Sequence, residues 1–177
     1  KAPEISGKLS FNAHVLMVED NETNRLILDQ ILTTLGCTTQ HATNGQAALD
    51  AMENENFDLV MMDVQMPVMD GLTATRIIRD NESKLDQARQ LIIALTANAL
   101  AGDREMCLKA GMDDYVSKPV TIGSIRTVMQ RWLPSHKLRA QTAAISQPEL
   151  PSISFKFDLQ DLRASLGSEA YRIVPAI

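Results

Sequence analysis

The sequence predicts an α/β fold in which a parallel sheet carries helices on both of its faces. Short apolar runs alternate with longer segments of helical periodicity, and five such strand-and-helix units follow one another between residues 13 and 133. The most apolar run, Leu59–Met62, is continuous rather than alternating, which is typical of a strand buried on both faces. Crossovers between parallel strands are right-handed, so the helices are expected to divide between the two faces.

The expected strands are short apolar or β-branched segments that end in a polar residue or a turn. They cover His14–Val18, Thr38–Ala42, Leu59–Met62, Leu91–Leu95 and Asp114–Ser117. Three of the runs lead directly into a carboxylate or a hydroxyl group, at Glu19, Asp63 and Thr96.

Capping residues and apolar stripes define the expected helices. Asn21 caps the first helix, which ends before Gly36. Further helices are expected after Asn44-Gly45 and over residues 72–81, 103–110 and 122–133. The side chains expected to face the core are Ile27, Leu28, Ile31, Leu32 and Leu35 in the first helix, Ala47, Ala48, Ala51 and Met52 in the second, Ile77 and Ile78 in the third, and Ile125, Val128, Met129 and Trp132 in the last.

Composition narrows the possible functions. The 177 residues, 45% of them hydrophobic, allow one ordinary domain with a proper core plus an appendage. The formal net charge of −5 argues against a nucleic-acid-binding surface. No apolar run approaches the ~20 residues that cross a bilayer. The two cysteines, Cys37 and Cys107, have no metal-binding or redox spacing and are expected to be buried thiols in a reducing, cytoplasmic compartment.

Changes of composition divide the chain into four parts. Residues 1–12 are expected to be a polar tail from an upstream segment, and residues 13–133 form the main domain. Residues 134–154 are rich in Ser, Gln, Ala, Thr and Pro, which is typical of a linker. Residues 155–177 have helical periodicity but are too short to bury a core alone.

Polar side chains stand at the ends of four predicted strands: Glu19 with Asp20, Asp63, Thr96 and Lys118. The carboxyl ends of parallel strands meet at one edge of a sheet, where ligands bind in such folds. Three crowded carboxylates require a cation, and their hard oxygens suit Mg²⁺. A lysine and a hydroxyl group beside them suit a phosphoryl group, with Asp63 as a plausible nucleophile that would form an aspartyl-phosphate.

Five motifs at these strand ends follow one another in a fixed order: Val18-Glu19-Asp20-Asn21 with Asn24, Met62-Asp63-Val64-Gln65-Met66-Pro67-Val68-Met69-Asp70-Gly71, Ala94-Leu95-Thr96-Ala97-Asn98-Ala99, Ala110-Gly111-Met112-Asp113-Asp114-Tyr115 and Ser117-Lys118-Pro119. In order and spacing they resemble the receiver domain of two-component signalling, most closely the receivers of hybrid sensor histidine kinases. The resemblance implies a flavodoxin-like (βα)5 fold with strand order 2-1-3-4-5.

The resemblance also assigns roles at the acidic end. It implies that Asp63 is the phosphoacceptor and that Asp20 binds Mg²⁺ directly. Glu19 would act mainly through metal-bound water, and Gln65 would contribute its backbone carbonyl to the metal shell.

Further roles in the family concern the response to phosphorylation. Thr96 would move its hydroxyl toward the phosphoryl group, and Tyr115 would rotate after it. Lys118 would pair with Asp63 and then with the phosphoryl oxygens. Pro119 would follow a cis peptide bond.

The function implied is transfer of a phosphoryl group to Asp63 from a phosphohistidine of a histidine kinase or a histidine phosphotransfer domain, followed by relay or hydrolysis. The parent would be a hybrid sensor histidine kinase anchored in the inner or plasma membrane, although the fragment has no glycine-rich nucleotide-binding segment. Residues 155–177 resemble the opening helices of a histidine phosphotransfer domain. Leu26, on the polar side of the first helix, is a candidate docking residue for the partner.

Other interpretations of the same residues remain open. A pseudo-receiver, an interaction module that is never phosphorylated, is one alternative. A phosphatase with an aspartate nucleophile is less favoured, because the usual second aspartate is Gln65 here. The three histidines, His14, His41 and His136, are interpreted as structural.

Overall fold

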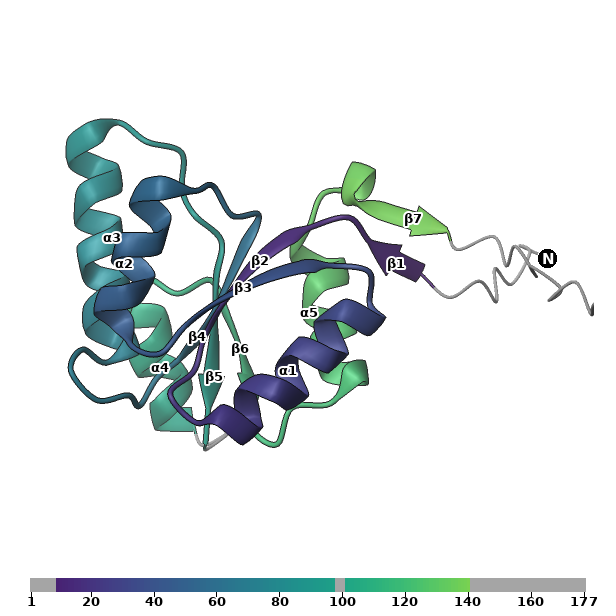
Figure 1. The fold of residues 1–177 in the computed structure, drawn as a ribbon. Coiled ribbons are helices and arrows are strands. Elements are labelled where there is room, and N and C mark those ends of the chain that lie inside the picture. Colours follow the sequence, from purple (N-terminus) through teal and green to yellow (C-terminus); the bar gives the residue numbers. More distant parts are fainter. Residues whose placement is uncertain (1–8, 98–100, 141–177) are drawn as a thin grey trace, which may run out of the picture. The chain divides into compact units, whose positions relative to one another are not determined.

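A computed structural model describes residues 9–97 and 101–140 of the chain (Figure 1). Its main sheet consists of five parallel strands in the order β3-β2-β4-β5-β6. These strands are β2 (His14–Val18), β3 (Thr38–Ala42), β4 (Leu59–Asp63), β5 (Ile92–Thr96) and β6 (Asp114–Ser117). Counted along the chain, this is the expected order 2-1-3-4-5, so the predicted flavodoxin-like arrangement is confirmed.

Five helices connect and follow the strands: α1 (Glu22–Thr34), α2 (Gly45–Asn54), α3 (Gly71–Leu85), α4 (Ala101–Ala110) and α5 (Ile122–Trp132). Side-chain caps start four of them, because Asn21, Asn44, Asp70 and Thr121 each accept a hydrogen bond from a backbone N–H three residues later. Helix α3 is longer than the apolar stripe predicts. Its last turn is polar and is supported by an ion pair between Lys84 and Asp80 at 2.6 Å.

The helices cover the two faces of the sheet, α1 and α5 on one and α2, α3 and α4 on the other (Figure 1). Alternate strand residues point to opposite faces, which is why each strand contributes to both cores. On the side of α1 and α5 the core contains Val15, Met17, Leu59, Met61, Ile93, Leu95, Leu28, Leu32, Ile125 and Met129. On the other side it contains Leu16, Val18, Val60, Met62, Ile92, Ala94, Ala48, Ala74, Ile78 and Cys107.

Two side chains expected in the core are instead exposed. Ile27 of α1 has 47% of its surface exposed and Trp132 of α5 has 41%. The indole N–H of Trp132 donates to Asp114, the first residue of β6, at 2.8 Å, so the partly exposed ring has a polar partner at the surface. Ile27 lies at the margin of the apolar stripe of α1, whose buried members are Leu28 and Leu32.

A two-stranded antiparallel ribbon joins the start and the end of the described domain. Strand β1 (Leu9–Phe11) pairs with β7 (Leu138–Ala140), which follows the short 3-10 helix η1 (Ser135–Lys137). Phe11 is 1% exposed and its backbone N–H donates to the carbonyl of Leu35 at 2.6 Å. The expected tail and linker are therefore partly folded, because Phe11 anchors this ribbon in the core.

The remaining expectations for the chain ends lie outside the described residues. These are the rest of the tail, the rest of the linker and the helical fragment over residues 155–177. Among the described helices, none is long and apolar enough to cross a membrane.

Candidate functional site

The register of the parallel strands brings the predicted site residues to one edge of the sheet. Val18 of β2 pairs with Met62 of β4, so Glu19 and Asp63 lie level with each other. On the other side of β4, Asp63 pairs with Leu95, one residue before Thr96. Thr96 in turn pairs with Ser117, directly before Lys118. The strand-end groups predicted from the sequence are therefore neighbours in space.

Three carboxylates meet at this edge. One oxygen each of Glu19, Asp20 and Asp63 lie within 4.8 Å of one another. Glu19 is 1% exposed and Asp63 is 5% exposed, whereas Asp20 faces solvent. A set of hard carboxylate oxygens that is open on one side fits Mg²⁺, which retains several of its waters in proteins. We call these three residues the acidic cluster.

Lys118 connects two members of the acidic cluster. Its ammonium group donates to Glu19 Oε2 at 2.6 Å and to Asp63 Oδ2 at 2.7 Å. Burial acts to lower the pKa of Lys118, but the hydrogen bonds and charges of the two carboxylates outweigh it and raise that pKa. Burial raises the pKa of Asp63, and the bond from Lys118 offsets this rise only in part.

The other predicted site residues also lie at this edge. The backbone N–H of Gln65 donates to Asp63 Oδ1 at 3.2 Å. Thr96 ends β5 and is 3% exposed. Tyr115 lies on β6, half-buried, with the Arg104 guanidinium 5.7 Å from the centre of its ring. The peptide bond before Pro119 is cis, as predicted.

The turn that follows Asp63 is held by close backbone packing. The N–H of Gly71 donates to the carbonyl of Val64 at 3.1 Å. A Cβ atom at Gly71 would stand 2.1 Å from the carbonyl oxygen of Asp63, so only glycine fits there. Val68 has a φ of 68°, unusual for a β-branched residue, and its side chain is 87% exposed. This turn sets the start of α3 directly against the end of β4.

Two hollows adjoin the acidic cluster. One of about 560 Å³ is open to solvent and lined by Asp20, Gln65, Met66, Pro67 and Met106 among others. A smaller one of about 110 Å³ lies on the α1 side and is lined by Glu19, Asn24, Ile27, Leu28, Leu95, Lys118, Pro119 and Val120.

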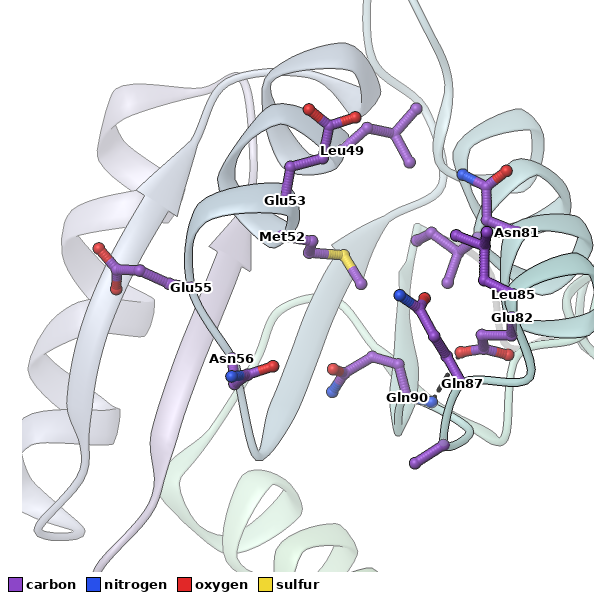
Figure 2. A pocket seen from close by; sticks show the side chains of 12 residues that line it. Leu49, Met52, Glu53, Glu55, Asn56, Asn81, Glu82, Leu85, Gln87 and Gln90 are labelled. Atoms are coloured by element: carbon purple, nitrogen blue, oxygen red, sulfur yellow. Dashed lines mark hydrogen bonds between the residues drawn. The ribbon is translucent and has the colours of Figure 1, made fainter.

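A third hollow, of about 520 Å³, has no residue in common with the acidic cluster (Figure 2). It is lined by residues of α2, of the second half of α3 and of the loop before β5, at the opposite end of the strands. Three glutamates line it, Glu53, Glu55 and Glu82, and Glu82 is paired with Arg79 at 2.8 Å. The candidate functional site is the acidic cluster, where three carboxylates and the ammonium group of Lys118 meet.

Two contacts of the site were not predicted from the sequence. The side-chain amide of Asn24 donates to Glu19 Oε1 at 3.0 Å. Arg25 donates to the backbone carbonyl of Glu19, also at 3.0 Å. Asn24 is the third residue of α1, a position whose side chain can reach back to the cap residue, but this pattern does not indicate a contact with Glu19.

The remaining candidates lie where the sequence analysis expected them. Leu26 of α1 is 64% exposed. None of His14, His41 and His136 takes part in the acidic cluster. His14 instead packs against Phe57, with ring centres 4.7 Å apart.

Comparison with known proteins gives a family and several relatives. The model of the response regulator receiver domain matches residues 15–130. The chain is 44% identical over 118 residues to sensor histidine kinase GacS of Pseudomonas protegens, and 44% identical over 122 residues to hybrid signal transduction histidine kinase G of Dictyostelium discoideum. The matches cover 67% and 68% of this chain but only 13% and 4% of those proteins.

Solved structures with the same fold include two of particular interest. One is the co-crystal structure of the Saccharomyces cerevisiae histidine phosphotransfer protein Ypd1 with the receiver domain of Ssk1, at 32% identity and a TM-score of 0.68, covering 72% of this chain and 93% of that chain. The other is the receiver domain of sensor histidine kinase PA1611 from Pseudomonas aeruginosa, with a magnesium ion in its active-site cleft. It is 42% identical, with a TM-score of 0.62, covering 68% of this chain and 97% of that chain.

Proposed function

Because this chain belongs to the response regulator receiver domain family, we propose that it accepts a phosphoryl group on Asp63 in a two-component phosphorelay. The observation that carries this proposal is the position of Lys118, whose ammonium group bridges Asp63 and Glu19 beside a third carboxylate. Two of these carboxylates are almost fully buried, an arrangement that costs stability and is typical of a reactive site.

The donor set of the acidic cluster supports a bound Mg²⁺, and the related receiver of PA1611 holds this ion in its cleft. We propose Glu19, Asp20, Asp63 and the backbone carbonyl of Gln65 as the groups that hold it. When bound, Mg²⁺ would neutralise negative charge on the phosphoryl oxygens.

The chain's own residues would perform the remaining steps. A carboxylate oxygen of Asp63 attacks the phosphorus of a phosphohistidine, and the new O–P bond forms as the P–N bond breaks. The leaving imidazole nitrogen keeps the bonding electron pair and takes up a proton. Lys118 stabilises the ionised form of Asp63 before transfer and the phosphoryl oxygens after it. Thr96 and Tyr115 are proposed to change conformation in response to phosphorylation of Asp63.

The proposed partner is the phosphohistidine of a histidine kinase or a histidine phosphotransfer domain, as in the complex of Ypd1 with Ssk1. Leu26 and Ile27 support a docking surface on α1, because both are exposed apolar side chains, at 64% and 47%. Ile27 also lines the hollow that contains Glu19 and Lys118. We propose that the whole protein is a hybrid sensor histidine kinase.

Intact-mass analysis after incubation with Mg²⁺ and acetyl phosphate tests the assignment of Asp63. The wild type is expected to gain one acid-stable, base-labile phosphoryl group, and Asp63→Asn none. Asp70→Asn is the matched control, since asparagine caps a helix as well as aspartate does and Asp70 lies outside the acidic cluster.

The other outcomes separate the alternatives. If the wild type gains no phosphoryl group under conditions in which a control receiver domain does, the result favours an interaction module of the pseudo-receiver kind. If Asp63→Asn is phosphorylated to the same level as the wild type, the phosphoacceptor is a residue other than Asp63. Continuous release of phosphate from a phosphomonoester would indicate a phosphatase.

A further inference from the structure

The Glu19 carboxylate is held at both of its oxygens by different parts of the fold. Oε1 accepts from the side-chain amide of Asn24 at 3.0 Å and from the backbone N–H of Asn21 at 3.3 Å. Oε2 accepts from Lys118 at 2.6 Å. The side chain of Glu19 is only 2% exposed, so water does not readily replace a lost donor. Its orientation therefore depends on these few groups.

Asn24 is itself fixed in place. It lies in the first turn of α1, where its backbone N–H donates to the cap residue Asn21 at 3.0 Å. Arg25, the next residue, donates to the backbone carbonyl of Glu19. The first turn of α1 therefore contacts Glu19, just after β2, at both its side chain and its backbone carbonyl. The amide of Asn24 donates to Oε1.

We propose that Asn24 is a positioning residue, which fixes the plane of the Glu19 carboxylate so that Oε2 faces the acidic cluster. Lys118 contacts Glu19 Oε2 and Asp63 Oδ2 together, so Oε2 is the oxygen on the side of the phosphoacceptor. Asn24 is uncharged and binds the far oxygen, so it orients Glu19 without competing with a cation for Oε2. The inference rests on the proposed Mg²⁺ site.

Removal of the amide would free Glu19 to turn. Only the long contact from Asn21 would then remain on Oε1, and a buried carboxylate oxygen with too few donors is unfavourable. Rotation about the last side-chain bond would let both oxygens share Lys118. Loss of a hydrogen bond that orients a metal-binding group typically weakens metal binding about 10–100-fold.

The test is a Mg²⁺ titration of ¹⁵N-labelled protein without a phosphodonor, in which binding is monitored by ¹H–¹⁵N chemical shifts. Asn24→Ala is expected to weaken Mg²⁺ binding about tenfold. Thr23→Ala, a matched change of an exposed residue in the same turn, is expected to bind as the wild type does. Asn24→Leu keeps a branched side chain of similar size but has no hydrogen-bond donor, and it replaces the alanine variant if that variant does not fold. It is expected to show the same loss of Mg²⁺ affinity.

A double-mutant cycle then separates a positioning role from a general effect on the fold. In a Glu19→Gln background, Asn24→Ala should cause no further loss of affinity, because the charged group through which it acts is gone. An equal loss in both backgrounds, or an unchanged affinity of Asn24→Ala, would overturn the inference. If the wild type itself binds no Mg²⁺, the proposed metal site is wrong and the inference falls with it.

Discussion

Replacement of Gly71 by alanine is expected to damage both stability and phosphorylation. Gly71 opens α3 and packs against the end of β4, where its Cβ would lie 2.1 Å from the carbonyl oxygen of Asp63. Ordinary contact begins near 3.4 Å, so the two elements must separate by about 1.3 Å (3.4 − 2.1). The opposing atom belongs to the backbone of a buried strand and cannot turn aside.

The magnitude follows from two opposing effects. Overpacking of a closely packed interior typically costs about 1–3 kcal/mol and occasionally more. Alanine gains about 0.5–1 kcal/mol over glycine within a helix, but less at its first residue. We expect Gly71→Ala to lower the free energy of unfolding by roughly 2 kcal/mol. The yield of phosphorylated Asp63 should fall as well, because its backbone is displaced.

Urea unfolding and intact-mass phosphorylation measure both effects. Gly102→Ala is the matched control, because a Cβ at Gly102 in α4 meets no atom within 4 Å. This variant should be as stable as the wild type or more so, by about 0.5–1 kcal/mol, and should be phosphorylated normally. Equal stability of Gly71→Ala and the wild type would refute the close approach of α3 to Asp63.

Two further predictions concern Lys118 and Leu26. Lys118→Met should lower the free energy of unfolding by about 3 kcal/mol at pH 7, because two buried carboxylates lose their partner. The folded-state pKa of Lys118 is raised above 10.5, so its contribution to stability is complete below pH 10.5 and is lost as the pH rises through the raised pKa. In urea unfolding, the stability difference between the wild type and Lys118→Met should therefore shrink in that pH range. A difference that stays constant there would contradict the pairing of Lys118 with the two carboxylates. Leu26→Ala should slow phosphoryl transfer from a partner phosphohistidine severalfold without changing phosphorylation by acetyl phosphate, because a docking contact of about 1 kcal/mol is lost. Leu85→Ala, equally exposed at 64% but at the far end of α3, should leave both rates unchanged, and equal rates for all three proteins would exclude this docking surface.

Much of the fold could be predicted from the sequence because strand burial and helix capping are local signals. The continuous apolar run before Asp63 and the caps at Asn21 and Asn44 place their elements to within a few residues. Helix periodicity alone did not determine which side chains at the edge of a stripe are covered. Ile27 and Trp132 are exposed for this reason, the latter because its N–H finds Asp114.

The acidic cluster could also be predicted, since parallel strands bring their carboxyl ends together regardless of loop detail. The contact of Asn24 with Glu19 could not, because it depends on the angle at which α1 leaves β2. Phe11 likewise gave no signal within a short polar segment. It is buried where β1 pairs with a strand more than 120 residues later along the chain and packs beside Leu35.

That pairing has a mechanical meaning. Leu9 faces Ala140 and Phe11 faces Leu138, so the polypeptide enters and leaves the domain at neighbouring points, roughly 5 Å apart as in any antiparallel pair. A rearrangement at the far end of the strands therefore changes the separation of these two points little. The β1–β7 ribbon thus holds the two ends of the described domain side by side. Tension applied between the two ends of the domain would open the β1–β7 ribbon one residue pair at a time, beginning with Leu9 and Ala140. The force would reach the five-stranded sheet only after the ribbon had opened.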